Sequence, residues 1–195
     1  MILARPQAFD TSQVLYKALG AFWNKGYEAT SLSELIGVMG LSKSSLYATF
    51  GGKRELFLAA FDLYREDRRV ELYAILNEGE ARAAIERYFR LILTDASRPG
   101  FANGCMSINQ AVELAPHDPE VRSRVQGDFD MLENALAETV ERGQVEGTIR
   151  LQKNSSRLLA RILMISFPGL QVMVRAGKSA EWLDEALAAF ISVLD

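Results

Sequence analysis

A short polar run, Ser42-Lys43-Ser44-Ser45, holds the residues of this sequence that are best suited to bind a charged ligand. Serine hydroxyls and a lysine ammonium donate hydrogen bonds, and small side chains let a backbone approach its ligand closely. Leu46 and Phe50 follow, four residues apart, and form an apolar face. The remaining positions of the segment face the other way: Tyr47, Ala48 and Thr49. The pattern predicts a short amphipathic helix with a polar outer side.

Signals for helix ends surround this run. Ser31 and Glu34 have the spacing of a capping box, which predicts the start of a preceding short helix. Gly40 interrupts the helical pattern, and Ser42 is suited to cap the next helix. A glycine pair that begins at position 51 ends that second helix. Two short helices around a glycine turn form a helix-turn-helix, here over residues 31–50. The second helix of such a unit enters the DNA major groove and contacts base edges there.

The distribution of charge is compatible with binding to DNA through one end of the chain. The net charge is −3, which by itself does not favour a nucleic-acid partner. Residues 1–54 nevertheless contain six basic and three acidic side chains, whereas residues 55–195 contain 16 basic and 22 acidic ones. We therefore expect contacts with phosphates to come from the N-terminal part, with Lys43 and Lys53 as candidates.

The only cysteine and the only histidine, Cys105 and His117, are the remaining candidates for chemistry. Their spacing does not match a metal site, so we expect no metal, no cofactor and no catalytic residues. An enzyme with Cys105 as nucleophile and His117 as base is the alternative, to be tested by loss of turnover in Cys105→Ser. A helical interaction module without DNA binding is a second alternative. Cys105 itself is either a small buried apolar residue or a reactive thiol that senses oxidants or electrophiles.

Helical periodicity extends over the rest of the chain and predicts an all-α fold of about nine helices. We expect a helix-turn-helix domain at residues 1–54 with three helices, joined to a larger helical domain at 55–195. Its helices are expected at 53–76, 81–95, 105–114, from 119 past 140, 155–174 and 180–194. The sequence has no secretory signal, and no apolar stretch approaches the roughly 20 residues of a membrane span, so we expect a cytoplasmic protein.

The segment from about Phe9 to Tyr64 resembles the DNA-binding domain of the TetR/AcrR family of bacterial regulators. The resemblance covers nearly a third of the chain and rests on an ordered series of motifs: Ala21-Phe22, Gly26-Tyr27, Thr30-Ser31-Leu32, Met39-Gly40-Leu41-Ser42-Lys43, Ser45-Leu46-Tyr47 and Phe50-Gly51-Gly52-Lys53-Arg54-Glu55-Leu56-Phe57. Further along, Gly104-Cys105-Met106 and Pro116-His117-Asp118-Pro119 are similar to a subgroup of the same family.

The resemblance implies a homodimeric repressor that binds a palindromic operator in double-stranded DNA and is released by a small-molecule inducer. The residues expected at DNA are Ser31, Ser42, Lys43, Ser44, Ser45, Tyr47, Ala48, Thr49 and Lys53. Ala48 departs from the polar residue that many relatives have, and it can make only an apolar contact, such as one with a thymine methyl. The expected effector pocket contains Phe89, Cys105, Asn109 and Phe129. The expected dimer interface contains Leu159, Leu163, Leu183, Leu187, Phe190 and Ile191.

Overall fold

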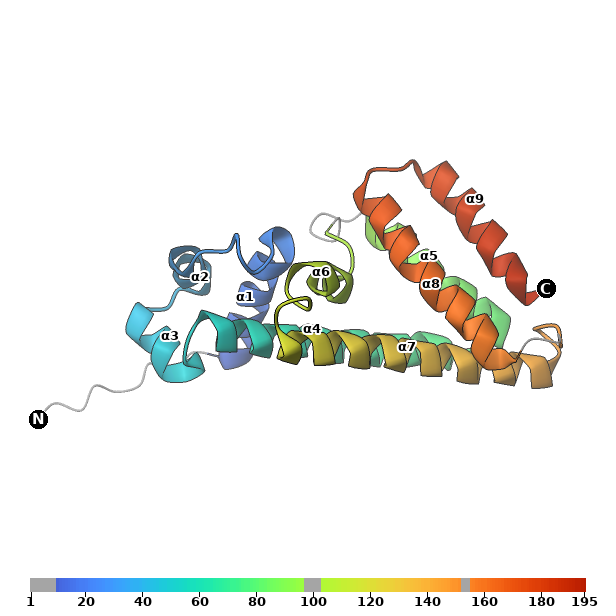
Figure 1. Cartoon of the computed structure of the whole chain (residues 1–195), viewed down its shortest axis with the longest axis horizontal. Coiled ribbons are helices and arrows are strands. Elements are labelled where there is room, and N and C mark those ends of the chain that lie inside the picture. The colour runs from blue at the N-terminus through green and yellow to red at the C-terminus, as the bar shows by residue number, and fades with distance from the viewer. Residues whose placement is uncertain (1–9, 97–102, 152–154) are drawn as a thin grey trace, which may run out of the picture. The chain divides into compact units, whose positions relative to one another are not determined.

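The computed structural model describes residues 10–96, 103–151 and 155–195, and over these residues the chain is helical without any strand, as the sequence predicted. Residues 1–9, which include the basic Arg5, lie outside the described residues. The elements are α1 (Thr11–Lys25), α2 (Leu32–Met39), α3 (Lys43–Phe50), α4 (Lys53–Leu76), α5 (Ala81–Ala96), α6 (Met106–Glu113), α7 (Pro119–Glu146), α8 (Ser156–Arg175), α9 (Ala180–Ile191) and a 3-10 turn (Ser192–Leu194), as labelled in Figure 1.

The chain divides into two compact units, which we call the head, ending at Tyr64, and the body, starting at Arg65. We expected the boundary ten residues earlier, at the start of α4. The first turns of α4 belong to the head because the apolar side chains of these turns are buried against the other head helices. Phe57 is 1 % exposed and its ring lies 5.2 Å from that of Phe22 in α1, in an edge-to-face arrangement. Aromatic pairs of this geometry stabilise a small core beyond the area they bury.

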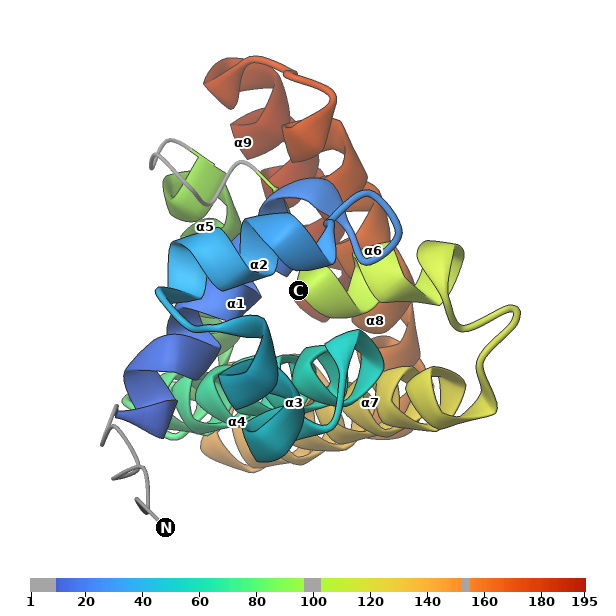
Figure 2. The same cartoon turned by 90° about the vertical axis from the view of Figure 1, so that its left-hand side faces the viewer.

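Local hydrogen bonds fix the ends of the three head helices. The side chains of Asp10, Ser31 and Ser42 each accept a backbone N–H from two or three residues further on, which satisfies a donor that the first helical turn leaves unpaired. Between α2 and α3 the chain turns at Gly40, whose φ of 70° is a left-handed conformation that favours glycine. Figure 2 shows α2 and α3 on either side of this turn.

The body is built around α7, which packs against α5, α6 and α8. Its core is almost entirely aliphatic and aromatic, with α9 and the 3-10 turn closing one side. Figure 1 shows α8 crossing α5 and α7, with α9 returning beside it. The largest fully buried side chains of this core include Phe89, Ile85, Leu136 and Ile149. The core therefore joins residues that lie more than a hundred positions apart in the sequence.

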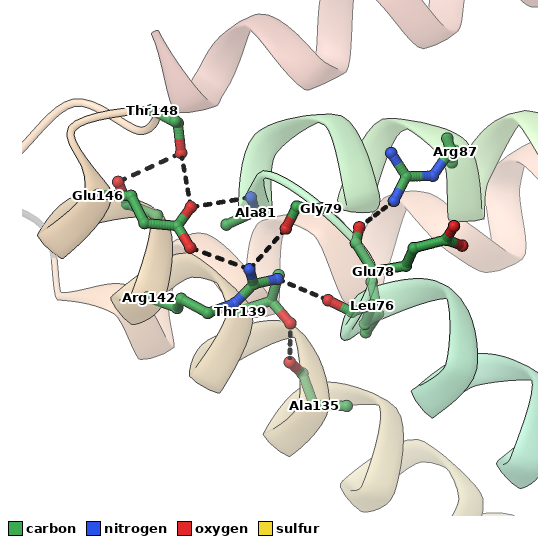
Figure 3. Close-up of polar contacts among 11 residues, drawn as sticks. Leu76, Glu78, Gly79, Ala81, Arg87, Ala135, Thr139, Arg142, Glu146 and Thr148 are labelled. Atoms are coloured by element: carbon green, nitrogen blue, oxygen red, sulfur yellow. Dashed lines mark hydrogen bonds and ion pairs between the residues drawn. The ribbon is translucent and has the colours of Figure 1, made fainter.

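The C-terminal end of α7 holds the junction between α4 and α5 (Figure 3). The Arg142 guanidinium donates to the carbonyl oxygens of Leu76 at 2.6 Å and Gly79 at 2.8 Å, which are groups that the end of α4 leaves without helical partners. The Glu146 carboxylate accepts the backbone N–H of Ala81, the first residue of α5, at 3.1 Å and pairs with Arg142 at 3.0 Å. One turn of α7 thus caps two other helices.

Helix α8 corrects the expectation that no stretch is long and apolar enough to cross a membrane. By length and composition alone, its 20 residues are long and apolar enough to do so. The reason is that both faces of the helix are apolar. Leu159 and Leu163 are fully buried in the body core, whereas Ile165 is 77 % exposed on another face.

Candidate nucleic-acid interface and effector region

The start of α3 is a compact group of serine hydroxyls. Ser42 Oγ accepts the backbone N–H of Ser45 at 3.1 Å and lies 2.9 Å from Ser44 Oγ and 2.8 Å from Ser45 Oγ. Ser42 and Ser44 are exposed and Ser45 is half-buried. Because hydroxyls both donate and accept, this group can rearrange its bonds toward a phosphate or a base edge without moving the backbone.

The rest of α3 presents the predicted polar side. Lys43, Ala48 and Thr49 are exposed, and Tyr47 is 47 % exposed, so this tyrosine is a surface residue rather than a core aromatic. The opposite side holds the helix in place, since Leu46 is fully buried. Phe50 is only half-buried, which is less than its position on the apolar face predicted. The outer side of α3 is therefore available to a partner along its whole length.

Two residues outside α3 extend this surface. Ser31 is exposed at the N-terminus of α2, and Lys53 is the first residue of α4. The Lys53 ammonium lies 4.3 Å from the centroid of the Tyr27 ring, a cation–π contact that limits where the charge can point. The N-terminus of α4 adds a partial positive charge at the same place. By contrast, Lys25 pairs with Glu34 at 2.7 Å and so adds less to the positive potential of the head.

The structure places the four predicted effector residues in different environments. Phe89 is fully buried, and its ring lies 4.9 Å from that of Phe190 and 6.3 Å from that of Phe167. Cys105 and Phe129 are half-buried against the same core. The Asn109 side chain accepts a hydrogen bond from Arg175 at 2.6 Å and donates one to the Asn103 carbonyl at 2.9 Å. Phe89 and Asn109 therefore have packing and positioning contacts of their own.

Tyr88 is a candidate that the sequence analysis did not select. It is half-buried on α5 and its ring is stacked on that of Phe167, with centroids 6.0 Å apart and an interplanar angle of 15°. Burial raises the pKa of the Tyr88 phenol far above its usual value, and the nearby Cys105 thiol adds to the shift. The phenol therefore stays protonated and remains a hydrogen-bond donor. The aromatic pair at positions 88 and 89 was the only signal in the sequence.

The structure places most of the predicted dimer residues inside the protomer. Leu159, Leu163, Leu183, Leu187 and Ile191 are at most 4 % exposed, and all of them belong to the core of the protomer. Phe190 packs against the same core and is half-buried. The side chains of α8 and α9 that a partner can contact are different ones: Leu158, Ile165, Val172 and Trp182, which are 42 to 77 % exposed.

Comparison with known proteins supplies a family for both units. Residues 14–60 match the model of bacterial regulatory proteins of the tetR family, and residues 79–190 match that of the tetracyclin repressor-like C-terminal domain. The chain is 32 % identical over 194 residues to the uncharacterized HTH-type transcriptional regulator YezE of Bacillus subtilis, covering 99 % of this chain and all of that one. It is 31 % identical to the HTH-type transcriptional repressor ComR of Escherichia coli, covering 92 % and 86 % of the two chains.

Solved structures agree with these matches. A cysteine mutant of the TetR family regulator CifR, complexed with double-strand operator DNA, superposes with a TM-score of 0.86 at 26 % identity, covering 98 % of this chain and all of that one. A TetR regulator from Chloroflexus aurantiacus superposes with a TM-score of 0.82 at 26 % identity, covering 93 % and 91 % of the two chains. The fold therefore agrees with that of these regulators over nearly the whole chain.

Proposed function

Because the chain belongs to the TetR family of bacterial regulatory proteins, it is a DNA-binding transcriptional regulator, and we propose that it is a repressor that a small ligand releases from a palindromic operator. The observation that supports this most directly is the outer side of α3, where exposed polar residues follow a helix-turn-helix turn. We also propose a cytoplasmic location, since the operator is there.

Within this surface we assign two kinds of contact. Lys43 and Lys53 bind phosphates, because one is exposed at the start of α3 and the other lies at the N-terminus of α4. Ser45 and Ala48 face base edges and set the preferred sequence, with Ala48 limited to an apolar contact. The full set of proposed DNA contacts is Ser31, Ser42, Lys43, Ser44, Ser45, Tyr47, Ala48, Thr49 and Lys53.

Operator selection followed by salt titration tests this assignment. Duplexes bound by the wild type are recovered from a random pool, and the affinity is measured at several salt concentrations. Lys43→Ala and Lys53→Ala should each lower the slope of log affinity against log salt by about 1, because each lysine releases the counterion of one phosphate. Lys178→Ala in the body is the matched control, with an unchanged slope. Wild-type slopes in both head variants would remove these lysines from the interface.

We propose that a second copy of the chain covers the exposed apolar side of α8. Leu158, Ile165 and Val172 are spaced by seven residues, so they lie along one side of the helix, and Trp182 on α9 is exposed as well. Two helices from each copy would form a four-helix interface with a two-fold axis, the symmetry that a palindromic operator requires.

A charge placed in the middle of this stripe should separate the copies. Ile165→Glu is expected to give a monomer at micromolar concentration and to lose operator binding, because a buried unpaired carboxylate is costly. Val145→Glu is the control, since Val145 is 86 % exposed on α7 and outside the stripe. The mass of both variants is measured by light scattering. A monomeric wild type, or a dimeric Ile165→Glu, would contradict the proposed interface.

For the ligand we propose the region where α5, α6 and α8 meet. Cys105 precedes α6 as its N-cap residue, and both Cys105 and Tyr88 pack partly buried against the core of the body. The stacked Tyr88 and Phe167 rings offer an apolar face, and the phenol offers a donor. Of the residues expected from the sequence, Cys105 and Phe129 remain candidates for contact, whereas Phe89 and Asn109 are supporting residues.

A further inference from the structure

The carboxylate of Asp128 on α7 holds two other helices at once. One of its oxygens accepts a hydrogen bond from Arg65 Nε of α4 at 2.7 Å, and the other accepts one from Ser107 Oγ of α6, also at 2.7 Å. Ser107 is 4 % exposed, and the side chains of Asp128 and Arg65 are 12 % and 26 % exposed. Hydrogen bonds to a carboxylate that is largely shielded from water are among the stronger ones in proteins.

Arg65 places this contact at the point of α4 where the head ends and the body begins. Arg65 is the first residue of the body and directly follows Tyr64, the last residue of the head, within one continuous helix. The body half of α4 is therefore attached to α7 at its beginning, through Arg65, and at its end, through the carbonyls of Leu76 and of Gly79 just beyond the helix. Figure 3 shows the second of these attachments. Of these two attachments, the one next to the head uses the Asp128 carboxylate, which also accepts the hydrogen bond from α6.

Helix α6 is short and is held by side chains from its neighbours. Eight residues are too few for a stable isolated helix, so tertiary contacts must keep it in place. Ser107 bonds to Asp128 near its beginning, and Asn109 bonds to Arg175 at the end of α8. A ligand or adduct near Cys105, two residues before Ser107, would act on the part of α6 that Asp128 holds.

We propose that Asp128 is the positioning residue that couples α6 to α4, so that a shift of α6 changes how Arg65 is held where the head begins. When Ser107 withdraws, the carboxylate loses the hydrogen bond from the serine hydroxyl, and its orientation toward Arg65 changes. The proposal rests on the proposed function, because the coupling matters only if operator binding responds to the state of the body. It predicts that operator and α6 influence each other in both directions, since binding linkage is reciprocal.

The single cysteine provides a probe of α6 that needs no knowledge of the natural ligand. Cys105 is the only thiol in the chain, so its reaction with dithiodipyridine, a neutral disulfide that releases a coloured thione, reports on the start of α6 alone. The rate is measured for the free protein and for the protein saturated with its selected operator. In the wild type we expect the operator to change this rate about fivefold or more, the lower range of typical allosteric couplings.

Two variants break the connection and one serves as control. Ser107→Ala and Asp128→Asn should still bind operator, but the ratio of rates with and without operator should fall to about one. Asp130→Asn makes the same change of charge at an exposed position two residues along α7 and should keep the wild-type ratio. Circular dichroism checks that each variant is folded, and Ser107→Ala, which leaves the Arg65–Asp128 pair in place, decides the question if Asp128→Asn does not fold.

The outcomes separate this inference from the function on which it rests. A wild type that binds operator with an unchanged thiol rate would overturn the coupling and leave the repressor proposal intact. A wild-type ratio retained in Asp128→Asn or in Ser107→Ala would overturn the role of this carboxylate. A wild type that binds no duplex from the pool would overturn the proposed function, and the coupling with it.

Discussion

Helix ends in the head are capped by neighbouring residues, whereas the body combines such local caps, at α7, α8 and α9, with caps that come from far along the chain. In the head, Ser42 caps α3 by accepting the N–H of Ser45, three residues away. In the body, Arg142 caps α4 from a distance of 66 residues, and Glu146 caps α5 from 65. The surface proposed to meet DNA is therefore specified by its own short segment, whereas the junction between α4 and α5 depends on contacts that form only when the body folds.

The strongest test of this contrast is the loss of the long-range cap. Arg142→Met keeps the length of the side chain but removes its donors to Leu76 and Gly79 and the partner of Glu146. We expect a loss of about 2 kcal/mol in the free energy of unfolding of the body, the range for hydrogen bonds to a charged group. Urea denaturation measures it. The control is Arg124→Met, whose ion pair with Glu120 is one turn away on the same helix and contributes about 0.3 to 0.5 kcal/mol.

The corresponding change in the head should cost less. Ser42→Ala removes the cap of α3, and we expect a loss of about 1 kcal/mol, the typical value for an N-cap serine. Amide exchange at the start of α3, measured without DNA, should become faster there and stay unchanged in the body. Ser33→Ala, an exposed serine inside α2, is the control. Destabilisation of both units by Ser42→Ala would show that the head is less independent than its local bonds suggest.

The smallest expected effect is a dependence of the stability of the body on pH, through Glu146. The N–H of Ala81, and after it the charge of Arg142, hold the pKa of Glu146 below its usual value of 4.5. Because the folded state has the lower pKa, this contribution to stability is present above pH 4.5 and is lost as the pH falls through the folded pKa. The stability difference between wild type and Glu146→Gln should therefore shrink on acidification. Urea titrations at several pH values measure it, and Glu138→Gln, exposed on α7, should show no such trend.

What the sequence could predict follows the same division. The caps at Ser31 and Ser42 and the turn at Gly40 were predicted because their signals lie within four residues of each other. Together with helical periodicity, these signals placed all the helices of the described chain within a few residues of their observed ends.

Residues whose role depends on remote partners could not be predicted. Nothing near Asp128 in the sequence indicates Arg65, which lies 63 positions away. The residues predicted for the interface on α8 lie on its buried side, and the sequence could not show this because the helix is apolar on both sides. Leu158 is 42 % exposed and Leu159 is fully buried, although a single position separates them. Hydrophobic periodicity identifies an apolar side of a helix, but it does not show whether the same chain or a second copy covers that side.

The exposed apolar side of α8 makes the fraction of chains that are folded dimers depend on the total concentration of the chain. If a second copy covers this side as proposed, a separated chain leaves Ile165 in water, and partner binding stabilises the folded state by mass action, so stability rises with the number of copies in the cell. At low copy number a larger fraction of chains is monomeric and open to proteolysis. Doubling the gene dosage would then raise the number of intact dimers more than twofold, which makes repression a steep function of synthesis.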